Sequence, residues 1–321
     1  MNMMPDSDRK VFYFTISDNQ FLPRTLAMCK SLRNFTNSDI SFVHTESLSG
    51  ESRLAFESHN IDLSPIETIG VDFVKSLTSS RSHVEFMWTL PSVLLDWFMT
   101  NSPGYSDYVY LDADLFFYSD VEAIWDEIPA GNISITPHRF STRLESAFPE
   151  SGEFNVSWVG IPATDIGRKC AKKWAEQCIQ LCPASPIRVN GKTVYGDQMY
   201  LEDWPSDYAG YVHIISHVGA GLAPWNYENY KIVESTEFTV DEIALIFYHF
   251  SSHQFGFPFA SRIGREYSRI RPIPKKIYKV YETSLRECVL ELGFKQWRSR
   301  YKPLWLRIWK FIVRFLSKSS Q

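Results

Sequence analysis

The stretch Tyr108-Val109-Tyr110-Leu111-Asp112-Ala113-Asp114-Leu115-Phe116-Phe117 carries the pattern from which the fold is predicted. An apolar run typical of a buried strand ends in two carboxylates one residue apart, Asp112 and Asp114. Two ionised carboxylates this close repel each other unless a cation joins them. At a strand end they can hold Mg²⁺ or Mn²⁺, which takes oxygen ligands and commonly completes its shell with phosphate oxygens. A polar turn after a buried strand is the alternative.

Strands and helices alternate on both sides of this stretch. We expect strands at 11–16, 40–44, 107–111, 133–136, 158–161 and 212–215, helices at 22–32, 51–59, 84–99 and 165–181, and a further core element at 243–250. Such alternation predicts an α/β fold with a mixed, mostly parallel central sheet and ligands at the carboxyl ends of its strands. We expect one domain over residues 1–255.

The chain changes character after that domain. Residues 1–261 hold 17 Lys and Arg against 33 Asp and Glu, whereas residues 262–321 hold 16 against 4. Residues 256–321 are therefore predicted to be a basic C-terminal extension. If segment 303–318 is an α-helix, with a rotation of about 100° per residue, its basic side chains lie on one side and its Leu, Ile, Phe and Trp side chains on the other.

A basic amphipathic helix with tryptophans is typical of a helix that lies flat on an anionic membrane surface. Packing of this helix on the body, or on another subunit of a homo-oligomer, is the alternative. The acidic body argues against nucleic acid as a main ligand.

The amino-acid composition restricts the kind of protein that this chain can be. With 321 residues, 44% hydrophobic and 22% charged, the chain is expected to be globular, and its 15% aromatic content favours stacking surfaces for rings or sugars. Five cysteines, an odd number without a CxxC pair, favour a reducing compartment. Cys170, Trp174, Cys178 and Cys182 recur every four residues, which indicates a core-facing stripe rather than a metal site. The polar N-terminus and the lack of an apolar run of about 18 residues predict a cytoplasmic protein.

The run around Asp112 and Asp114 resembles the DxD motif of GT-A-fold glycosyltransferases. Further segments over residues 10–255 resemble glycosyltransferase family 8, the group of glycogenin and the bacterial lipopolysaccharide galactosyltransferases. In that family the DxD motif binds Mn²⁺ bridging the diphosphate of a nucleotide sugar. The resemblance therefore implies that Asp112 and Asp114 bind both metal and donor, with Mn²⁺ or Mg²⁺ as cofactor.

Other family segments occur in the family's order. The loop 15–21 looks like the one that receives the nucleotide base, which implies donor contacts for Thr15, Ser17, Asp18 and Phe21. Glu153 to Gly160 is similar to the F-N-x-G segment, whose Asn faces the donor sugar, and 196–201 resembles the D-Q-x-x-L helix start. By resemblance, Asn155, Asp197 and Gln198 are the catalytic candidates. Ala223-Pro224-Trp225-Asn226 looks like the later W-N element.

Phe247-Tyr248-His249-Phe250 is similar to the family's H-F segment and makes His249 the third metal ligand by resemblance. The family often continues with Gly and a diphosphate-binding Lys, whereas Ser251-Ser252-His253 follows here. His253 or His217 could therefore replace His249, and Arg81 could replace the lysine. Taken singly, Asp197 also fits a helix cap, Asn155 a turn residue and His249 a core histidine.

These motifs together predict a metal-dependent glycosyltransferase that moves a sugar from a nucleotide diphosphate donor, UDP by resemblance, to a glycan or lipid-linked acceptor. Retention of the anomeric configuration is implied by the family. The basic tail favours peripheral binding to the inner membrane face and a part in bacterial surface polysaccharide, such as lipopolysaccharide, synthesis. The alternatives are a nucleotidyltransferase that makes nucleotide sugars, a phosphatase of the haloacid dehalogenase type, and a non-catalytic membrane-associated binding protein.

Overall fold

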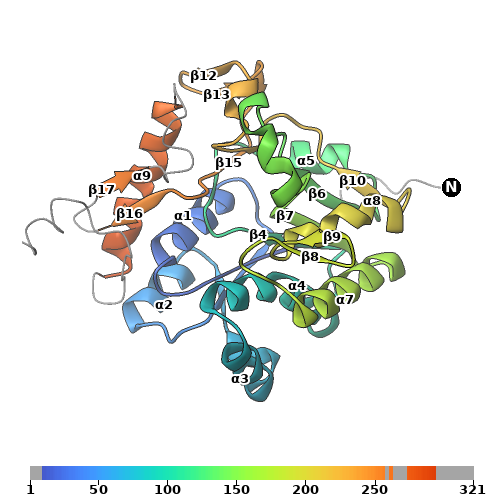
Figure 1. Ribbon diagram of the computed structural model, residues 1–321. Coiled ribbons are helices and arrows are strands. Elements are labelled where there is room, and N and C mark those ends of the chain that lie inside the picture. Colours follow the sequence, from blue (N-terminus) through green and yellow to red (C-terminus); the bar gives the residue numbers. More distant parts are fainter. Residues whose placement is uncertain (1–8, 257–259, 263–272, 294–321) are drawn as a thin grey trace, which may run out of the picture.

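The computed structural model describes residues 9–256, 260–262 and 273–293 (Figure 1). Its strands are β1 (Val11–Ser17), β2 (Asp39–His44), β3 (Asp62–Pro65), β4 (Asp107–Leu111), β5 (Leu115–Phe117), β6 (Ile133–Pro137), β7 (Phe154–Pro162), β8 (Ile187–Val189), β9 (Lys192–Val194), β10 (Val212–Ile214), β11 (Ala220–Leu222), β12 (Ile232–Glu234), β13 (Phe238–Val240), β14 (Ile243–Ala244), β15 (Phe247–His249), β16 (Gln254–Gly256) and β17 (Ala260–Arg262).

The helices alternate with the early strands and follow the later ones. The α-helices are α1 (Leu22–Arg33), α2 (Gly50–Glu57), α3 (Val71–Ser80), α4 (His83–Asn101), α5 (Glu122–Glu127), α6 (Phe148–Ser151), α7 (Asp165–Gln180), α8 (Trp204–Asp207) and α9 (Lys275–Glu291). Short 3₁₀ helices are η2 (Ile66–Ile69), η3 (Thr142–Ala147), η4 (Gln198–Asp203) and η5 (Tyr227–Asn229).

Seven strands form the central sheet in the order β10-β6-β7-β4-β1-β2-β3. All neighbouring pairs are parallel except those of β7, which runs antiparallel to both β4 and β6. Because β1 and β4 are parallel, with Phe14 opposite Tyr110, their carboxyl ends lie at the same edge of the sheet. The amino end of β7 lies at that edge too, since Leu111 is opposite Trp158. This edge positions the candidate site.

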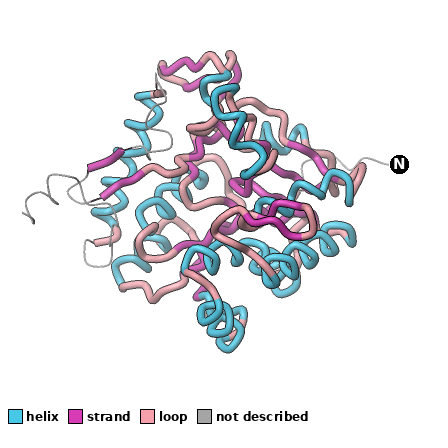
Figure 2. The backbone as a smooth tube through the Cα atoms, viewed as in Figure 1, coloured by secondary structure: helices cyan, strands magenta, loops and turns pink. Residues whose placement is uncertain are grey.

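Side chains alternate between the two faces of the sheet, and both faces are buried. Along β1, Tyr13 belongs to a core cluster with α1, α2, α5 and α9, whereas Phe12 and Phe14 belong to a second cluster with α3, α4 and α7. Figure 1 shows α4 and α7 together on one face of the sheet, and they pack directly on each other. In Figure 2 the strands run through the middle of the molecule with helices on both sides.

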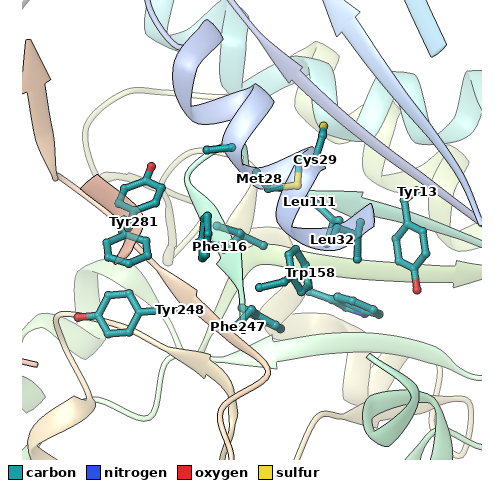
Figure 3. Packing of buried hydrophobic residues seen from close by; sticks show 14 of the residues in the cluster. Tyr13, Met28, Cys29, Leu32, Leu111, Phe116, Trp158, Phe247, Tyr248 and Tyr281 are labelled. Atoms are coloured by element: carbon teal, nitrogen blue, oxygen red, sulfur yellow. The ribbon is translucent and has the colours of Figure 1, made fainter. Parts of the chain in front are cut away.

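A second, three-stranded sheet, β11-β15-β5, packs on the first cluster. Figure 3 shows Phe116 and Phe247 of this sheet beside Trp158 of the central sheet and Tyr281 of α9. The rings of Trp158 and Phe247 are stacked with centroids 6.2 Å apart. The second sheet therefore joins residues far apart in the sequence to the central sheet.

The predicted α/β class, with a mixed and mostly parallel central sheet, is confirmed. Every strand and helix predicted within the described residues is present, and its bounds differ by only a few residues from the predicted ones. Helix α3 was not predicted; residues 78–82, which include its last three residues, are rich in serine and were interpreted as a loop. Cys170, Trp174 and Cys178 are buried on α7 as expected, whereas Cys182 is buried beyond the end of that helix.

The predicted amphipathic helix at 303–318 lies outside the described residues. The domain boundary at residue 255 stays a prediction, but α9, which follows it, is part of the main core through Tyr281, Leu285 and Cys288. None of the helices among the described residues has the length and apolar character that a membrane crossing requires.

Candidate active site

Asp112 and Asp114 follow β4, in the turn that leads into β5. The backbone N–H of Asp112 donates to the carbonyl of Ser157 on β7 at 3.1 Å, which continues the β4–β7 ladder by one residue. The hydroxyl of Tyr110 donates to Oδ1 of Asp112 at 2.9 Å. The aspartate that directly follows the strand is thus held by the central sheet itself.

His249 reaches the two aspartates through the second sheet. Strand β15 pairs antiparallel with β5, with His249 opposite Leu115, and the N–H of Phe250 donates to the carbonyl of Asp114 at 2.9 Å. Nε2 of His249 lies 3.1 Å from Oδ1 of Asp114 and 3.6 Å from Oδ2 of Asp112. Within the described part of the chain, these three residues form a cluster whose ligand atoms all lie within 4.8 Å of one another.

The three groups strongly influence one another's ionisation. Burial, with the Asp114 charge adding to it, raises the pKa of Asp112 to about 6. Burial alone would raise the pKa of Asp114, but the His249 imidazolium lowers it below its usual value. Burial alone would lower the pKa of His249, yet the Asp114 carboxylate raises it. Without a cation, the imidazolium is the positive charge that holds the two carboxylates together.

This cluster fits a divalent cation. Two carboxylates and one imidazole give a set of two oxygens and one nitrogen, which suits Mn²⁺ and similar borderline ions. Nε2 of His249, and not Nδ1, points to the carboxylates, and the ring edge of Trp225 packs on the imidazole with centroids 5.1 Å apart. This packing restricts the orientation of the imidazole, whose Nδ1 has no hydrogen-bond partner among the described residues.

A cavity of about 570 Å³ lies beside the cluster. Nine residues predicted as site residues line it: Ser17, Asp18, Phe21, Asp112, Asp114, Asn155, Asp197, Gln198 and His249. Thr15 and Arg81 do not line it. The tertiary structure therefore brings nearly all the predicted residues, which span more than 200 positions of sequence, to one space.

The loop after β1 forms one end of this cavity. Oδ1 of Asp18 accepts hydrogen bonds from the N–H groups of Gln20 and Phe21 at 2.9 and 3.2 Å, which shapes the start of α1. Oδ2 of Asp18 pairs with Nε2 of His83 at 2.9 Å. Phe21 keeps 40% of its surface exposed, and the guanidinium of Arg24 lies 4.8 Å from its ring centroid. The exposed ring is available for stacking.

Asn155, Asp197 and Gln198 supply amide and carboxylate groups to the cavity. Oδ1 of Asn155 accepts from the N–H of Ser157 at 3.1 Å, and Nε2 of Gln198 donates to the carbonyl of Ser151 at 2.7 Å. Asp197 is 4% exposed, and within the described part of the protein its Oδ2 has no hydrogen-bond partner. Burial, with the nearby negative charges adding to it, raises the pKa of Asp197 well above its ordinary value.

A buried carboxylate oxygen without a partner is costly, which favours a ligand hydroxyl or amine as its missing partner. The backbone of Asp197 is fixed, because the indole N–H of Trp174 donates to its carbonyl at 3.0 Å. The predicted alternative of a helix cap does not hold, because Asp197 precedes the short η4 without a capping hydrogen bond from its side chain.

Arg81, the predicted replacement for the diphosphate-binding lysine, does not line the cavity. Its guanidinium donates to the carbonyl of Cys178 at 2.9 Å and also to the carbonyl of Ile179 and the hydroxyl of Thr89. These carbonyls lie in the last turn of α7, where a cation is favoured by the orphaned carbonyl groups. Thr15 is fully buried within β1, two residues before the edge of the sheet.

The two alternative histidines are placed elsewhere. Nε2 of His253 lies 3.3 Å from Oε1 of Glu282 on α9. His217 belongs to the loop whose backbone N–H groups are bound by Glu127. The described geometry thus selects His249 over both alternatives as the partner of the two aspartates.

The sequence reasoning missed several residues that line the cavity. They are His83, Val84, Met87, Trp88 and Pro91 of α4, together with Tyr110, His138, Phe140 and Tyr195. Helix α4 is apolar on almost all sides, so its sequence gives no signal that separates the cavity face from the core face. Asn226 of the W-N element is instead a structural residue, since its side chain bonds Ala223, Gly221 and His138 backbone groups.

Comparisons with known proteins extend these observations. No protein-family model matches the sequence. The uncharacterized protein YfnD of Bacillus subtilis (strain 168) is 37% identical over 174 residues, which are 54% of this chain and 55% of YfnD. The chain thus spans about half the length of that relative. The uncharacterized YfnF of the same organism is 24% identical over 251 residues, or 75% of this chain and 81% of YfnF.

Among solved structures, the galactosyltransferase LgtC in complex with donor and acceptor sugar analogs matches 92% of this chain and 99% of its own, with 15% identity and a TM-score of 0.51. An active-site mutant of LgtC gives the same coverage with 13% identity and a TM-score of 0.52. At this identity the likeness concerns the fold. The chain therefore has the GT-A fold that its DxD motif predicts, and in that fold it resembles the family 8 glycosyltransferases.

Proposed function

We propose that this chain is a metal-dependent glycosyltransferase that moves a sugar from a nucleoside diphosphate donor to a glycan or lipid-linked acceptor. The observation that carries the proposal is the convergence of Asp112, Asp114 and His249 at the edge of a cavity that also holds Asp197. The GT-A fold shared with LgtC supports it.

The charge of the cavity supports a requirement for a divalent cation. Four aspartates line it (Asp18, Asp112, Asp114 and Asp197), and no Lys or Arg does so among the described residues. A nucleoside diphosphate carries two to three negative charges and would be repelled by such a lining. Mn²⁺, or Mg²⁺, held by Asp112, Asp114 and His249 would reverse the local charge and draw negative charge from the departing diphosphate.

The remaining residues suggest how the donor lies. Phe21, exposed at the end of β1, would stack on the base, which we take to be uracil as the family resemblance implies. Ser17 and Asp18 line the same cavity as this ring and the aspartate pair, and the ribose would be placed on them. The sugar would then extend toward Asn155, Asp197 and Gln198, and the unpartnered Oδ2 of Asp197 would bind one of its hydroxyl groups.

The transfer breaks the bond between the anomeric carbon and the β-phosphate oxygen and forms a bond from that carbon to the acceptor oxygen. The acceptor hydroxyl loses a proton, and the departing phosphate oxygen takes it, so a nucleoside diphosphate and a glycoside are the products. In this retaining course no side chain has to act as a strong base. Asp197 and Asn155 position the sugar for the transfer.

We further propose that the acceptor belongs to a bacterial surface polysaccharide such as lipopolysaccharide, and that the protein works at the inner face of the membrane. The support is the sequence of the basic tail, with 16 Lys and Arg against 4 acidic residues in 262–321. Removing residues 298–321 should then release the protein from anionic vesicles while hydrolysis of the free donor continues. Vesicle binding that survives this deletion would contradict membrane attachment through the tail.

Calorimetric titration of UDP, with Mn²⁺ and then with EDTA, tests the central proposal. We expect binding that needs Mn²⁺ and that weakens at least about 100-fold in Asp114→Asn, because the neutral amide loses the charge that binds the cation. Asp126→Asn, the same change at an exposed position on α5, is the matched control and should bind as the wild type does. Equal binding by wild type and Asp114→Asn would refute the metal assignment, and the same titrations with CDP, dTDP and GDP identify the nucleoside.

A further inference from the structure

One wall of the cavity is apolar, and helix α4 builds most of it. Val84, Met87, Trp88 and Pro91 of this helix line the cavity, and their spacing of three or four residues places them on one helix face. Val84 remains 37% exposed, at the end of α4 near the Asp18–His83 pair. A helix face that is apolar and yet open to a cavity is a surface for an apolar part of a ligand.

Trp88 is fixed in this wall by two neighbours. Its ring lies against Gly196, where a Cβ atom would come within 3.2 Å of Cε3 of Trp88. The ring of Tyr195 packs edge-on against it, with centroids 5.5 Å apart and an interplanar angle of 87°. Both rings are only half-buried, so each keeps surface that faces the cavity.

The apolar wall is next to the polar groups that would hold the sugar. Gly196, which touches Trp88, is followed directly by Asp197, whose Oδ2 lacks a partner within the described part of the chain. A sugar bound by Asp197 would therefore lie with hydroxyl groups on the polar side chains and another part of its ring against Trp88 and Met87. Rings of this kind commonly bind the apolar C–H surface of a ligand.

We propose that Trp88, with Met87, Val84 and Tyr195, forms a subsite that selects a donor sugar bearing a methyl group. Such a group is the C6 methyl of a 6-deoxyhexose or the acetamido methyl of an N-acetylhexosamine. The inference rests on the proposed function and deepens it, because it names the class of donor sugar. A hydroxymethyl group placed on this wall would lose its hydrogen bonds to water, whereas a methyl group loses none.

The charged residues of the cavity further restrict the class of donor sugar. No Lys or Arg is among the described lining residues, so no guanidinium or ammonium group of the lining is available to pair with the carboxylate of an acidic sugar. The subsite therefore disfavours uronic and sialic acids. A neutral sugar with a methyl substituent fits both the apolar wall and the charge.

Matched nucleotide sugars test the inference on the full chain. Once calorimetry with Mn²⁺ has identified the nucleoside diphosphate that binds, three conjugates of that nucleotide are compared: glucose, 6-deoxyglucose and N-acetylglucosamine. We expect one of the two methyl-bearing donors to bind about 10- to 100-fold more tightly than the glucose donor, the range typical of apolar pockets. Comparison of the 6-deoxyglucose and N-acetylglucosamine conjugates shows whether the subsite binds the C6 methyl or the acetamido methyl.

Variants assign the preference to the wall. Trp88→Gln adds an amide that can bind a hydroxyl group and should reduce the preference at least about fivefold, with the affinity for the free nucleoside diphosphate unchanged. Trp97→Gln is the matched control, because Trp97 is also half-buried on α4 and packs on the same core cluster but does not line the cavity. Val84→Asn, at an exposed position, should reduce the preference without affecting folding.

The outcomes separate this inference from the proposed function. Metal-dependent binding of a nucleoside diphosphate without a preference for either methyl-bearing donor would overturn the subsite and leave the transferase proposal standing. A preference that survives in both Trp88→Gln and Val84→Asn would also overturn it. Absence of binding by every nucleoside diphosphate would overturn the proposed function, and the subsite with it.

Discussion

Substituting Gly196 by alanine probes the contact on which the geometry of the cavity depends. Gly196 has a φ of +58°, in the left-handed region where a Cβ atom is disfavoured. Its added Cβ would lie 3.2 Å from Cε3 of Trp88, which is closer than an ordinary carbon–carbon contact of about 3.5–4.0 Å. The indole or the Gly196 backbone therefore has to shift by a few tenths of an ångström.

Two contributions add up in this variant. The left-handed conformation costs an alanine about 1–2 kcal/mol, and displacing a packed ring costs about 1 kcal/mol more. We expect the free energy of unfolding to fall by about 2–3 kcal/mol, and the melting temperature by about 2–4 °C for each kcal/mol. Because the shift moves Trp88 or Asp197, the affinity for a nucleotide sugar should fall, while the affinity for the free nucleoside diphosphate should not.

Gly191→Ala separates the two contributions. Gly191 has a φ of +81° in the turn between β8 and β9, and its added Cβ would meet nothing within 4 Å. Its substitution should show the backbone cost alone and leave both affinities unchanged. Urea denaturation and calorimetric titration of the two variants provide the comparison. Equal losses of stability in both, together with unchanged affinity for the nucleotide sugar in Gly196→Ala, would refute the idea that the Gly196–Trp88 contact shapes the site.

Three further predictions concern other parts of the site. Phe21→Ala removes the stacking surface and should weaken the binding of nucleoside diphosphates about 5- to 100-fold in calorimetry. Binding of inorganic pyrophosphate, which has no base, should be unchanged. Equal effects on both ligands would contradict stacking. Arg81→Met should lower the free energy of unfolding, measured in urea, by about 1–3 kcal/mol, because three acceptors lose their donor. The Mn²⁺-dependent binding of the nucleoside diphosphate should be unaffected. Loss of that binding would show that Arg81 belongs to the site. Burial lowers the pKa of His138 from 6.5 to about 3, so the unfolded chain takes up a proton that the folded chain does not, and stability present above pH 6.5 is lost as the pH falls toward 3. Relative to His138→Gln, the wild type should lose about 2 kcal/mol of unfolding free energy between pH 6.5 and 5; a difference that is independent of pH would show that His138 titrates normally.

The elements around the site could be predicted because their patterns are local. The run from Tyr108 to Leu111 is apolar throughout, as expected for a parallel-sheet strand buried on both faces, and the two aspartates follow it directly. The same applies to Phe21 and Asp18 after β1. The α/β pattern predicts ligands at the carboxyl ends of parallel strands, and the family resemblance implied that the loop after β1 shares the site with the two aspartates.

The placement of Arg81 is a feature that local reasoning could not predict. By sequence it was the candidate to replace the family's diphosphate-binding lysine. In the structure its long side chain reaches the carbonyls that end α7, an element about 100 residues further along the chain. Neither the end of α7 nor the gap it leaves for a guanidinium can be read from the residues around position 81.

The sequence by itself determined the alternation of strands and helices, the carboxylate pair at the end of β4, and hence the fold class and the kind of ligand. These features depend on residues close in the chain, whose propensities and spacing act locally. The tertiary structure decided which histidine joins the aspartates, because only the pairing of β15 with β5 brings His249 to Asp114. It also decided which face of α4 lines the cavity and that Trp88 lies against Gly196. Packing between distant segments fixes these relations, and a helix that is apolar on nearly every side does not encode in its own sequence which face remains open.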